Sequence, residues 1–210
     1  MNSQGSKSSK VSGSAVLPRA FYQENAVVLA ERLIGKRLCT DIGGSGVTKG
    51  IIVETEAYMG KADPAAHSFR AGQDGRTSIM YGEGGYAYVY LIYGMHHCFN
   101  ITANTPELPE AVLIRALAPC SGVETMQARR NTTDSKKLCS GPGKLCAALG
   151  ITRAQYGADL CGGEVWLEAA EDLPPFTVAA SKRINIAYAG EAKNWLWRFT
   201  VAGSPYLSQK

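Results

Sequence analysis

The sequence predicts a single α+β domain, built around a curved, mainly antiparallel β-sheet that forms a partly open barrel flanked by helices. Three observations support this fold class. The chain has 210 residues and a hydrophobic fraction of 45%, enough for one large core. Short runs rich in Val, Ile, Tyr and Thr are bounded by glycine and proline, as strands and turns require. Helical segments lie between these runs without a regular strand–helix–strand rhythm, which disfavours a parallel sheet.

The first 16 residues contain six serines and no acidic residue, which predicts a disordered tail over 1–16 and one folded domain over 17–210. Residues 21–34 then place alanines and leucines at helical spacing, and Gly35 follows as a residue that ends a helix. Further helices are predicted over 123–130 and 143–149. Strands are predicted over 37–42, 48–57, 86–92, 98–102, 111–117, 165–168 and 197–201.

Composition excludes several classes of protein. The formal net charge is only +4, and no apolar run approaches the roughly 20 residues of a membrane span. The N-terminus lacks the apolar segment of a secretory signal. The six cysteines are widely spread without a CxxC pair, which is typical of packing residues rather than of disulfides or zinc ligands. We therefore expect an intracellular protein, bacterial or nuclear, with no membrane partner and with neither metal nor cofactor.

Positive charge is concentrated between residues 125 and 153, where six basic residues accompany one acid, Asp134. This excess could follow the phosphates of a nucleic acid, and a solvated loop explains the charge alone equally well. Residues 140–144, Ser-Gly-Pro-Gly-Lys, lie immediately before a predicted helix, whose N-terminus suits a phosphate. They lack the full Walker spacing, which disfavours nucleoside triphosphate binding.

Two glutamates share one face of a predicted strand. Alternation places Glu54, Glu56 and Tyr58 together, next to apolar residues. A partly desolvated carboxylate gains basicity and can deprotonate water. The structural alternative is that one glutamate pairs with an arginine and the other is solvated. Arg115 lies inside an apolar strand and needs an anion, so we expect Glu54 or Glu56 beside it, as a structural salt bridge or as a charged pair that holds a water.

The densest cluster covers residues 86–100, where four of the ten tyrosines fall within eight positions. Aromatic rings stack on bases, and Tyr93, at a bend beside Met95, could wedge between base pairs from the minor groove. An ordinary aromatic core hairpin also fits this pattern. His96 and His97 point to opposite faces of a strand, so they are a poor metal pair.

Taken together, these residues resemble the alkyladenine DNA glycosylase family, the methylpurine or 3-methyladenine type of DNA glycosylase. Order and spacing agree over nearly the whole chain, from about residue 17 to residue 208. The resemblance rests on Glu-Thr-Glu-Ala-Tyr at 54–58, Ala-Ala-His at 65–67, Tyr-Val-Tyr-Leu-Ile-Tyr-Gly-Met at 88–95, Asn100, Leu-Ile-Arg-Ala-Leu at 113–117, Leu-Cys-Ser-Gly-Pro-Gly-Lys-Leu-Cys at 138–146 and Gly-Ser-Pro at 203–205.

The resemblance implies a monofunctional base-excision enzyme that uses no metal or cofactor and acts on double-stranded DNA. Its substrates would be alkylated or deaminated purines, such as 3-methyladenine and hypoxanthine. No lysine lies in the pocket motifs, which argues against a Schiff-base lyase. The implied fold is a single mixed domain with a curved antiparallel sheet, and we expect a monomer.

Roles follow position by position from the resemblance. Glu56 would be the general base, and Arg115 and the main-chain carbonyl near Ile184 would help to hold the nucleophilic water. The flipped base would lie among Tyr58, His67 and Tyr90. The remaining assignments are Ala65, Cys98, Asn100 and Ile184 to the base pocket, with Asn100 excluding the amino group of guanine; Tyr93, Met95 and His96 to intercalation; and Lys136, Lys137, Ser140, Gly143 and Lys144 to phosphate contacts.

Two departures from the family pattern stand out. Residues 75–79, Gly-Arg-Thr-Ser-Ile, replace the usual Arg-Thr-Pro-Arg type of run, and position 97 is His where the family tends to have an aromatic residue. His96 could add a pH-sensitive phosphate contact. One alternative is a catalytically inactive protein that binds distorted DNA, but the presence of Glu56 and Arg115 argues against it. A second alternative is an RNA-binding module, but the usual sequence signatures of such modules are missing.

Overall fold

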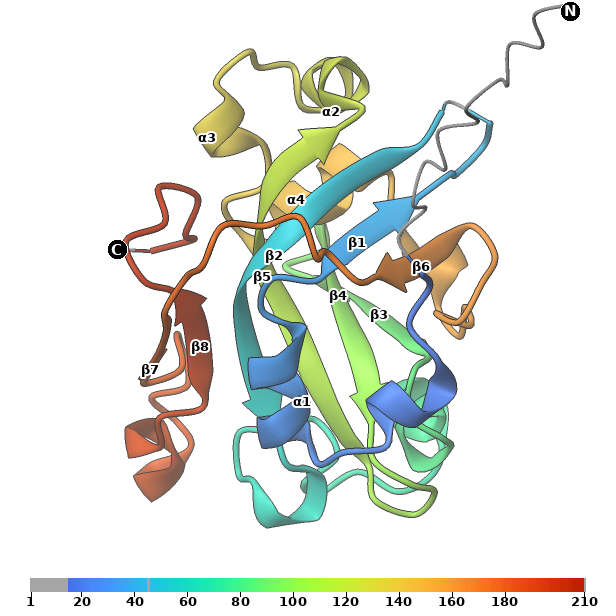
Figure 1. Cartoon of the computed structure of the whole chain (residues 1–210). Coiled ribbons are helices and arrows are strands. Elements are labelled where there is room, and N and C mark those ends of the chain that lie inside the picture. Colours follow the sequence, from blue (N-terminus) through green and yellow to red (C-terminus); the bar gives the residue numbers. More distant parts are fainter. Residues whose placement is uncertain (1–14, 45, 210) are drawn as a thin grey trace, which may run out of the picture.

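The computed structural model describes residues 15–44 and 46–209, which form one α+β unit (Figure 1). Its open sheet has the strand order β3-β4-β5-β2-β1-β6, and β8 pairs with both β2 and β7. All the strand pairs are antiparallel, which confirms the expected fold class. The strands are β1 Arg37–Thr40, β2 Thr48–Tyr58, β3 Ala87–Ile92, β4 His96–Ala103, β5 Glu110–Ser121, β6 Val165–Glu168, β7 Val178–Ser181 and β8 Arg198–Val201.

Two helices pack against the central strands and build the core. Helix α1 (Ala26–Leu33) contacts β2 and β5, whereas α4 (Pro142–Leu149) contacts β4 and β5, and their apolar residues join one buried cluster. Helix α2 (Val123–Arg130) packs on α4. The shorter helical elements are α3 Ser135–Leu138 and the 3₁₀ turns η1 Arg19–Tyr22, η2 Gly60–Ala62, η3 Gly75–Tyr81, η4 Arg153–Gln155 and η5 Gly190–Asn194.

Strand β2 has two buried faces with different chemistry, and a register shift between Ile52 and Glu54 interrupts the simple alternation of its side chains. Ile52 and Ala57 belong to the core, and the Thr55 hydroxyl donates to a main-chain carbonyl of α1. Glu54 and Glu56 lie on the opposite face, fully buried beneath the C-terminal third of the chain. Irregular pairing beside Glu54 marks the point where β2 exchanges β1 for β8 as a neighbour.

The first helix begins later than the expected range 21–34. The Asn25 side chain accepts hydrogen bonds from the main-chain N–H groups of residues 27 and 28, and this cap starts α1 at Ala26. The expected end is confirmed, because Gly35 has a φ of +83° just after the helix. The short elements α3 and β7 were not predicted.

The expected tail falls largely on residues 1–14, which lie outside the described residues. Ala15 and Val16 do not belong to it, because Ala15 accepts a hydrogen bond from the Ala169 N–H at 3.1 Å and Val16 bridges Glu168. Within the described part of the chain, no helix is long and apolar enough to cross a bilayer.

Candidate active site and DNA-binding surface

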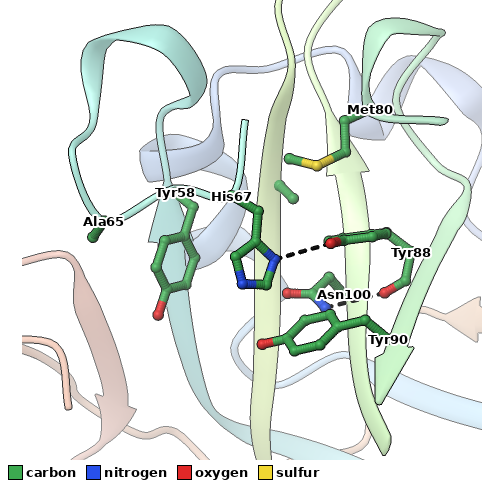
Figure 2. Close-up of a pocket in the computed structure, with 8 residues that line it drawn as sticks. Tyr58, Ala65, His67, Met80, Tyr88, Tyr90 and Asn100 are labelled. Atoms are coloured by element: carbon green, nitrogen blue, oxygen red, sulfur yellow. Dashed lines mark hydrogen bonds between the residues drawn. The ribbon is translucent and has the colours of Figure 1, made fainter. Parts of the chain in front are cut away.

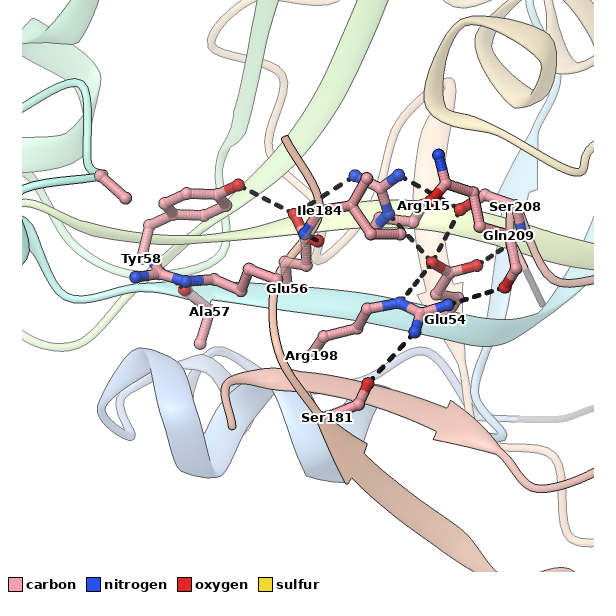
Figure 3. Close-up of polar contacts among 12 residues, drawn as sticks. Glu54, Glu56, Ala57, Tyr58, Arg115, Ser181, Ile184, Arg198, Ser208 and Gln209 are labelled. Atoms are coloured by element: carbon pink, nitrogen blue, oxygen red, sulfur yellow. Dashed lines mark hydrogen bonds and ion pairs between the residues drawn. The ribbon is translucent and has the colours of Figure 1, made fainter. Parts of the chain in front are cut away.

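Glu56 is a buried carboxylate that three donors hold in place (Figure 3). The Ile184 N–H donates to Oε1 at 2.6 Å, while the Tyr58 hydroxyl and Arg115 Nη1 donate to Oε2 at 2.8 and 3.2 Å. Burial raises the pKa of Glu56 above its ordinary value, and the Arg115 charge opposes this shift without cancelling it. A carboxylate in this state is oriented, basic and shielded from bulk water.

Arg115 bridges both glutamates rather than choosing one. Its Nε donates to Glu54 Oε1 at 3.0 Å and its Nη1 to Glu56 Oε2 at 3.2 Å, and Nη2 donates to the Ser208 hydroxyl at 3.2 Å. The planar guanidinium is therefore fixed on three sides. Both partners weighed from the sequence are present at once.

Glu54 has a different environment from Glu56. Burial alone would raise its pKa, but the Ser208 N–H (2.6 Å), Arg198 Nε (2.8 Å) and the Ser208 hydroxyl (2.7 Å), together with Arg115, hold that pKa below its ordinary value. Glu54 is thus a permanent anion that positions two arginines. The pKa values of the two neighbouring carboxylates therefore shift in opposite directions, because burial dominates at Glu56 and hydrogen bonds dominate at Glu54.

A second buried ion pair lies next to the residues that hold Glu56. Asp63 and Arg183, both with fully buried side chains, are joined by two hydrogen bonds of 2.5 and 2.9 Å. The Arg183 guanidinium lies 4.8 Å from the centre of the Tyr58 ring and 5.1 Å from the Trp197 ring. Because Ile184 is the next residue, the pair fixes both the Tyr58 ring and the N–H that binds Glu56.

An aromatic pocket lies beside this network, and its side chains converge from β2, the 65–67 loop, β3 and β4 (Figure 2). The His67 and Tyr90 rings meet edge-on at 4.6 Å, and His67 Nδ1 lies 2.9 Å from the Tyr88 hydroxyl. The cavity measures about 30 Å³, room for about one water. Its lining residues are Tyr58, Ala65, His67, Met80, Tyr88, Tyr90, Asn100 and Ala111.

His67 is neutral at physiological pH. Burial lowers its pKa to about 4, and the nearby positive charge of Arg76 contributes to the shift. The His67 ring therefore contributes no charge to the pocket wall, and it has one donor and one acceptor nitrogen.

Most of the pocket residues expected from the sequence come together, but two do not line the cavity. Cys98 is buried opposite Tyr90 across β3 and β4, and Ile184 binds Glu56 instead. Asn100 lines the cavity, and its side-chain NH₂ donates to the Tyr88 carbonyl at 3.0 Å.

The hairpin between β3 and β4 ends in an exposed apolar tip. Tyr93 is 80% exposed and Met95 70% exposed. Tyr93 has a φ of +53° and Gly94 one of +69°, so two left-handed residues begin the three-residue loop that joins β3 to β4. His96 packs against Gly143, where α4 begins: a Cβ on that glycine would lie only 3.0 Å from the His96 Cβ. The expected intercalating tip and the expected phosphate site are thus adjacent.

Some basic residues between 125 and 153 have structural partners, whereas others have no structural role in this fold that their contacts reveal. Arg129 and Arg130 donate to the main-chain carbonyls of Ala148 and Leu138, so they tie α2 to its neighbours. Lys137 pairs with Asp134 at 3.2 Å on the surface. Helix α4 starts without a side-chain cap, and Ser140 pairs with β5 through its backbone. The predicted phosphate ligands Lys136, Lys137, Ser140, Gly143 and Lys144 remain predictions.

A family model for methylpurine-DNA glycosylase matches residues 20–205, most of the chain. The chain belongs to this family. One relative, named a putative 3-methyladenine DNA glycosylase from Chlorobaculum tepidum, is 47% identical over 90% of this chain and 88% of its own length. Proteins of the same name from Alkaliphilus oremlandii and Clostridium tetani are 45% and 43% identical, each over 92% of this chain and 99% of its own length.

Membership of the methylpurine-DNA glycosylase family confirms the resemblance stated from the motifs. It identifies a hydrolase of N-glycosidic bonds whose substrate is DNA and whose process is the repair of alkylated bases. Among the described residues, no cluster of three or more metal-ligating side chains is present.

Sequence reasoning missed several supporting residues of this glycosylase site. Asp63 and Arg183 gave no signal, because each stands alone in a loop sequence. Arg198 and Ser208 lie 144 and 154 residues from Glu54, a separation that no local pattern covers. Met80 resembles an ordinary core residue, and only the pocket geometry reveals its place.

Proposed function

We propose that this protein is a monofunctional glycosylase that flips alkylated or deaminated purines out of duplex DNA and hydrolyses their N-glycosidic bond. The substrates would include 3-methyladenine and hypoxanthine. The observation that carries the proposal is Glu56, a buried carboxylate held by Ile184, Tyr58 and Arg115 at the side of an aromatic pocket. A monomer suffices, because every proposed group comes from one chain.

Glu56 is the proposed general base. It takes a proton from water, and the water oxygen bonds to the sugar carbon as the bond to the purine breaks. The electron pair of that bond leaves with the purine, which neutralises a cationic alkylpurine, whereas hypoxanthine also takes up a proton from solvent. Positive character develops on the sugar in the transition state, and the nearby carboxylate stabilises it. Arg115 and the Ile184 carbonyl would hold the water. The pocket residues include no lysine, so direct hydrolysis is proposed rather than a Schiff-base lyase step.

The pocket is too small in this structure to hold a purine and must widen for a base. A cavity of about 30 Å³ admits a water but not a purine, and the His67 and Tyr90 rings already touch. The base would therefore enter between Tyr58 on one side and these two rings on the other. Main-chain groups of Ala65 and His67 would read its edge, and Asn100 would exclude guanine.

The exposed hairpin tip supports the flipping step. A base inside a duplex is unreachable, and its extrusion costs roughly a few kcal/mol. Tyr93, with Met95 and His96 beside it, would fill the gap left in the stack. The adjacent start of α4, with Ser140, Gly143 and Lys144, would meet the backbone phosphates, together with Lys136 and Lys137.

The decisive experiment incubates the protein with duplex oligonucleotides that contain one hypoxanthine, and with DNA carrying radiolabelled 3-methyladenine. Wild-type protein should release the damaged base and leave an alkali-sensitive abasic site. Glu56→Gln should abolish excision while lesion binding persists. Glu110→Gln is the matched control: this buried glutamate binds the N–H of Ala26 outside the site, so excision should continue. Tight lesion binding without excision of either base by wild-type protein would favour a silent damage-binding protein.

A further inference from the structure

A groove of about 490 Å³ lies outside the aromatic pocket, and Tyr90 is a wall of both. Its floor is formed by residues 89–91 of β3, and its sides come from η3 and η4, two segments far apart in the sequence. Its main lining side chains are Arg76, Ser78, Tyr90, Leu91, Arg153 and Tyr156.

The groove is electropositive. None of its lining residues is acidic, and neither Arg76 nor Arg153 forms an ion pair within the described part of the chain. The Arg76 guanidinium lies 5.9 Å from the centre of the Tyr90 ring, so its positive charge lies next to the aromatic pocket, which Tyr90 also lines. Two unneutralised guanidinium groups in one concave surface suit an anion with several oxygen acceptors.

The two sides of the groove are fastened together. The Tyr156 hydroxyl lies 3.2 Å from the Ser78 hydroxyl and accepts a hydrogen bond from the Ile79 N–H at 3.3 Å. These contacts link η3 to the segment after η4, so Arg76 and Arg153 extend from walls that are already joined. A preformed groove requires less ordering when a ligand binds.

The groove also lies along the strand that leads to the exposed hairpin tip. Strand β3 ends at Ile92, so Tyr90 and Leu91 lie just before the exposed tip at Tyr93. On the other side of that tip, His96 packs against the start of α4. The tip is therefore placed between two surfaces that suit phosphates, one at α4 and one in the groove.

We propose that this groove binds the phosphodiester backbone of the lesion-bearing strand beside the extrahelical nucleotide, with Arg76 and Arg153 as the phosphate ligands. Leu91, which is partly exposed, would contact the adjacent sugar. The identity of the polymer as damaged duplex DNA rests on the proposed function. The residues 75–79 that depart from the family pattern would thereby supply a DNA contact.

The test measures the salt dependence of DNA affinity. Binding to a duplex with a stable abasic-site analogue is followed by fluorescence anisotropy between about 50 and 200 mM KCl. The logarithm of the binding constant falls linearly with the logarithm of the salt concentration, and each lost phosphate contact reduces the magnitude of this negative slope by about 0.9. Arg76→Gln and Arg153→Gln should each lower it by about that amount, and the double variant by about twice as much. Arg76→Lys should retain most of the slope.

Lys36→Gln is the charge-matched control, because it removes one positive charge near α1, away from the groove. If both arginine variants kept the wild-type slope, or changed it no more than Lys36→Gln, the proposed phosphate site would be wrong. Excision of 3-methyladenine by wild-type protein is assayed in parallel. Its absence would overturn the proposed function, whereas an unchanged slope with normal excision would overturn only the groove.

Discussion

Glu54 and Glu56 are two residues apart on the same strand face, yet their pKa values move in opposite directions. Glu54 accepts hydrogen bonds from Ser208, Arg198 and Arg115, which outweigh its burial. For Glu56 the burial effect is larger than the sum of its partners. The difference gives them separate properties: Glu54 is held as an anion between Arg115 and Arg198, whereas Glu56 is the more basic carboxylate, as its proposed role requires.

The raised pKa of Glu56 predicts an acid limb in the excision rate. The base is active only when ionised, and its ionised fraction falls as pH drops through its folded pKa, which lies above the ordinary value of 4.5. Single-turnover rates with enzyme in excess should therefore rise tenfold per pH unit below that pKa and level off above it. A rate that stays constant down to pH 4.5 would contradict the assignment of Glu56.

The β3–β4 hairpin has buried strands and an exposed tip. Val89 and Phe99 pack into the core, whereas Tyr93 extends into solvent. The left-handed turn at residues 93 and 94 therefore displays a large ring without any contribution from that ring to the core. Such a tip can be altered without damage to the fold.

Tyr93→Ser should weaken lesion binding and base flipping together, because nothing would then fill the gap in the duplex. Its unfolding free energy should stay within about 0.5 kcal/mol of wild type, as expected for an exposed site. Flipping can be followed with a fluorescent base analogue opposite or beside the lesion, and stability by urea unfolding. Tyr93→Phe serves as the control and should retain both activities. Normal flipping by Tyr93→Ser would show that another element forms the wedge.

Across the whole molecule, the sequence predicts what is local and misses what is distant. Alternation on β2 correctly placed Glu54, Glu56 and Tyr58 on one face, and the apolar context of Arg115 correctly indicated an acidic partner. No pattern could indicate Ser208 or Arg183, because their contacts with Glu54 and with the Ala57 carbonyl depend on how the chain returns to β2 after more than 120 residues. The late start of α1 is an exception, because its signal is local: the Asn25 side chain caps the N–H groups of residues 27 and 28.

The Asp63–Arg183 pair joins two segments 120 residues apart and should be important for stability. Asp63→Asn would leave the Arg183 charge buried without its counter-ion, at a cost of about 3–5 kcal/mol. Urea unfolding of the complete chain measures this loss. Asp172→Asn is the control, since Asp172 pairs with Arg37 at the exposed surface, and it should change the unfolding free energy far less. Equal unfolding free energies for the two variants would show that the Asp63–Arg183 pair does not contribute more to stability than a surface ion pair.

The exchange of β1 for β8 along β2 has a consequence for biosynthesis. The segments that complete the acidic network, at Ile184, Arg198 and Ser208, are made after α1, α4 and the strands that these two helices contact. Contacts between residues this distant in the chain form slowly. A nascent or prematurely terminated chain can therefore be compact and still inactive, so the cell gains the activity only once synthesis has passed the final strand.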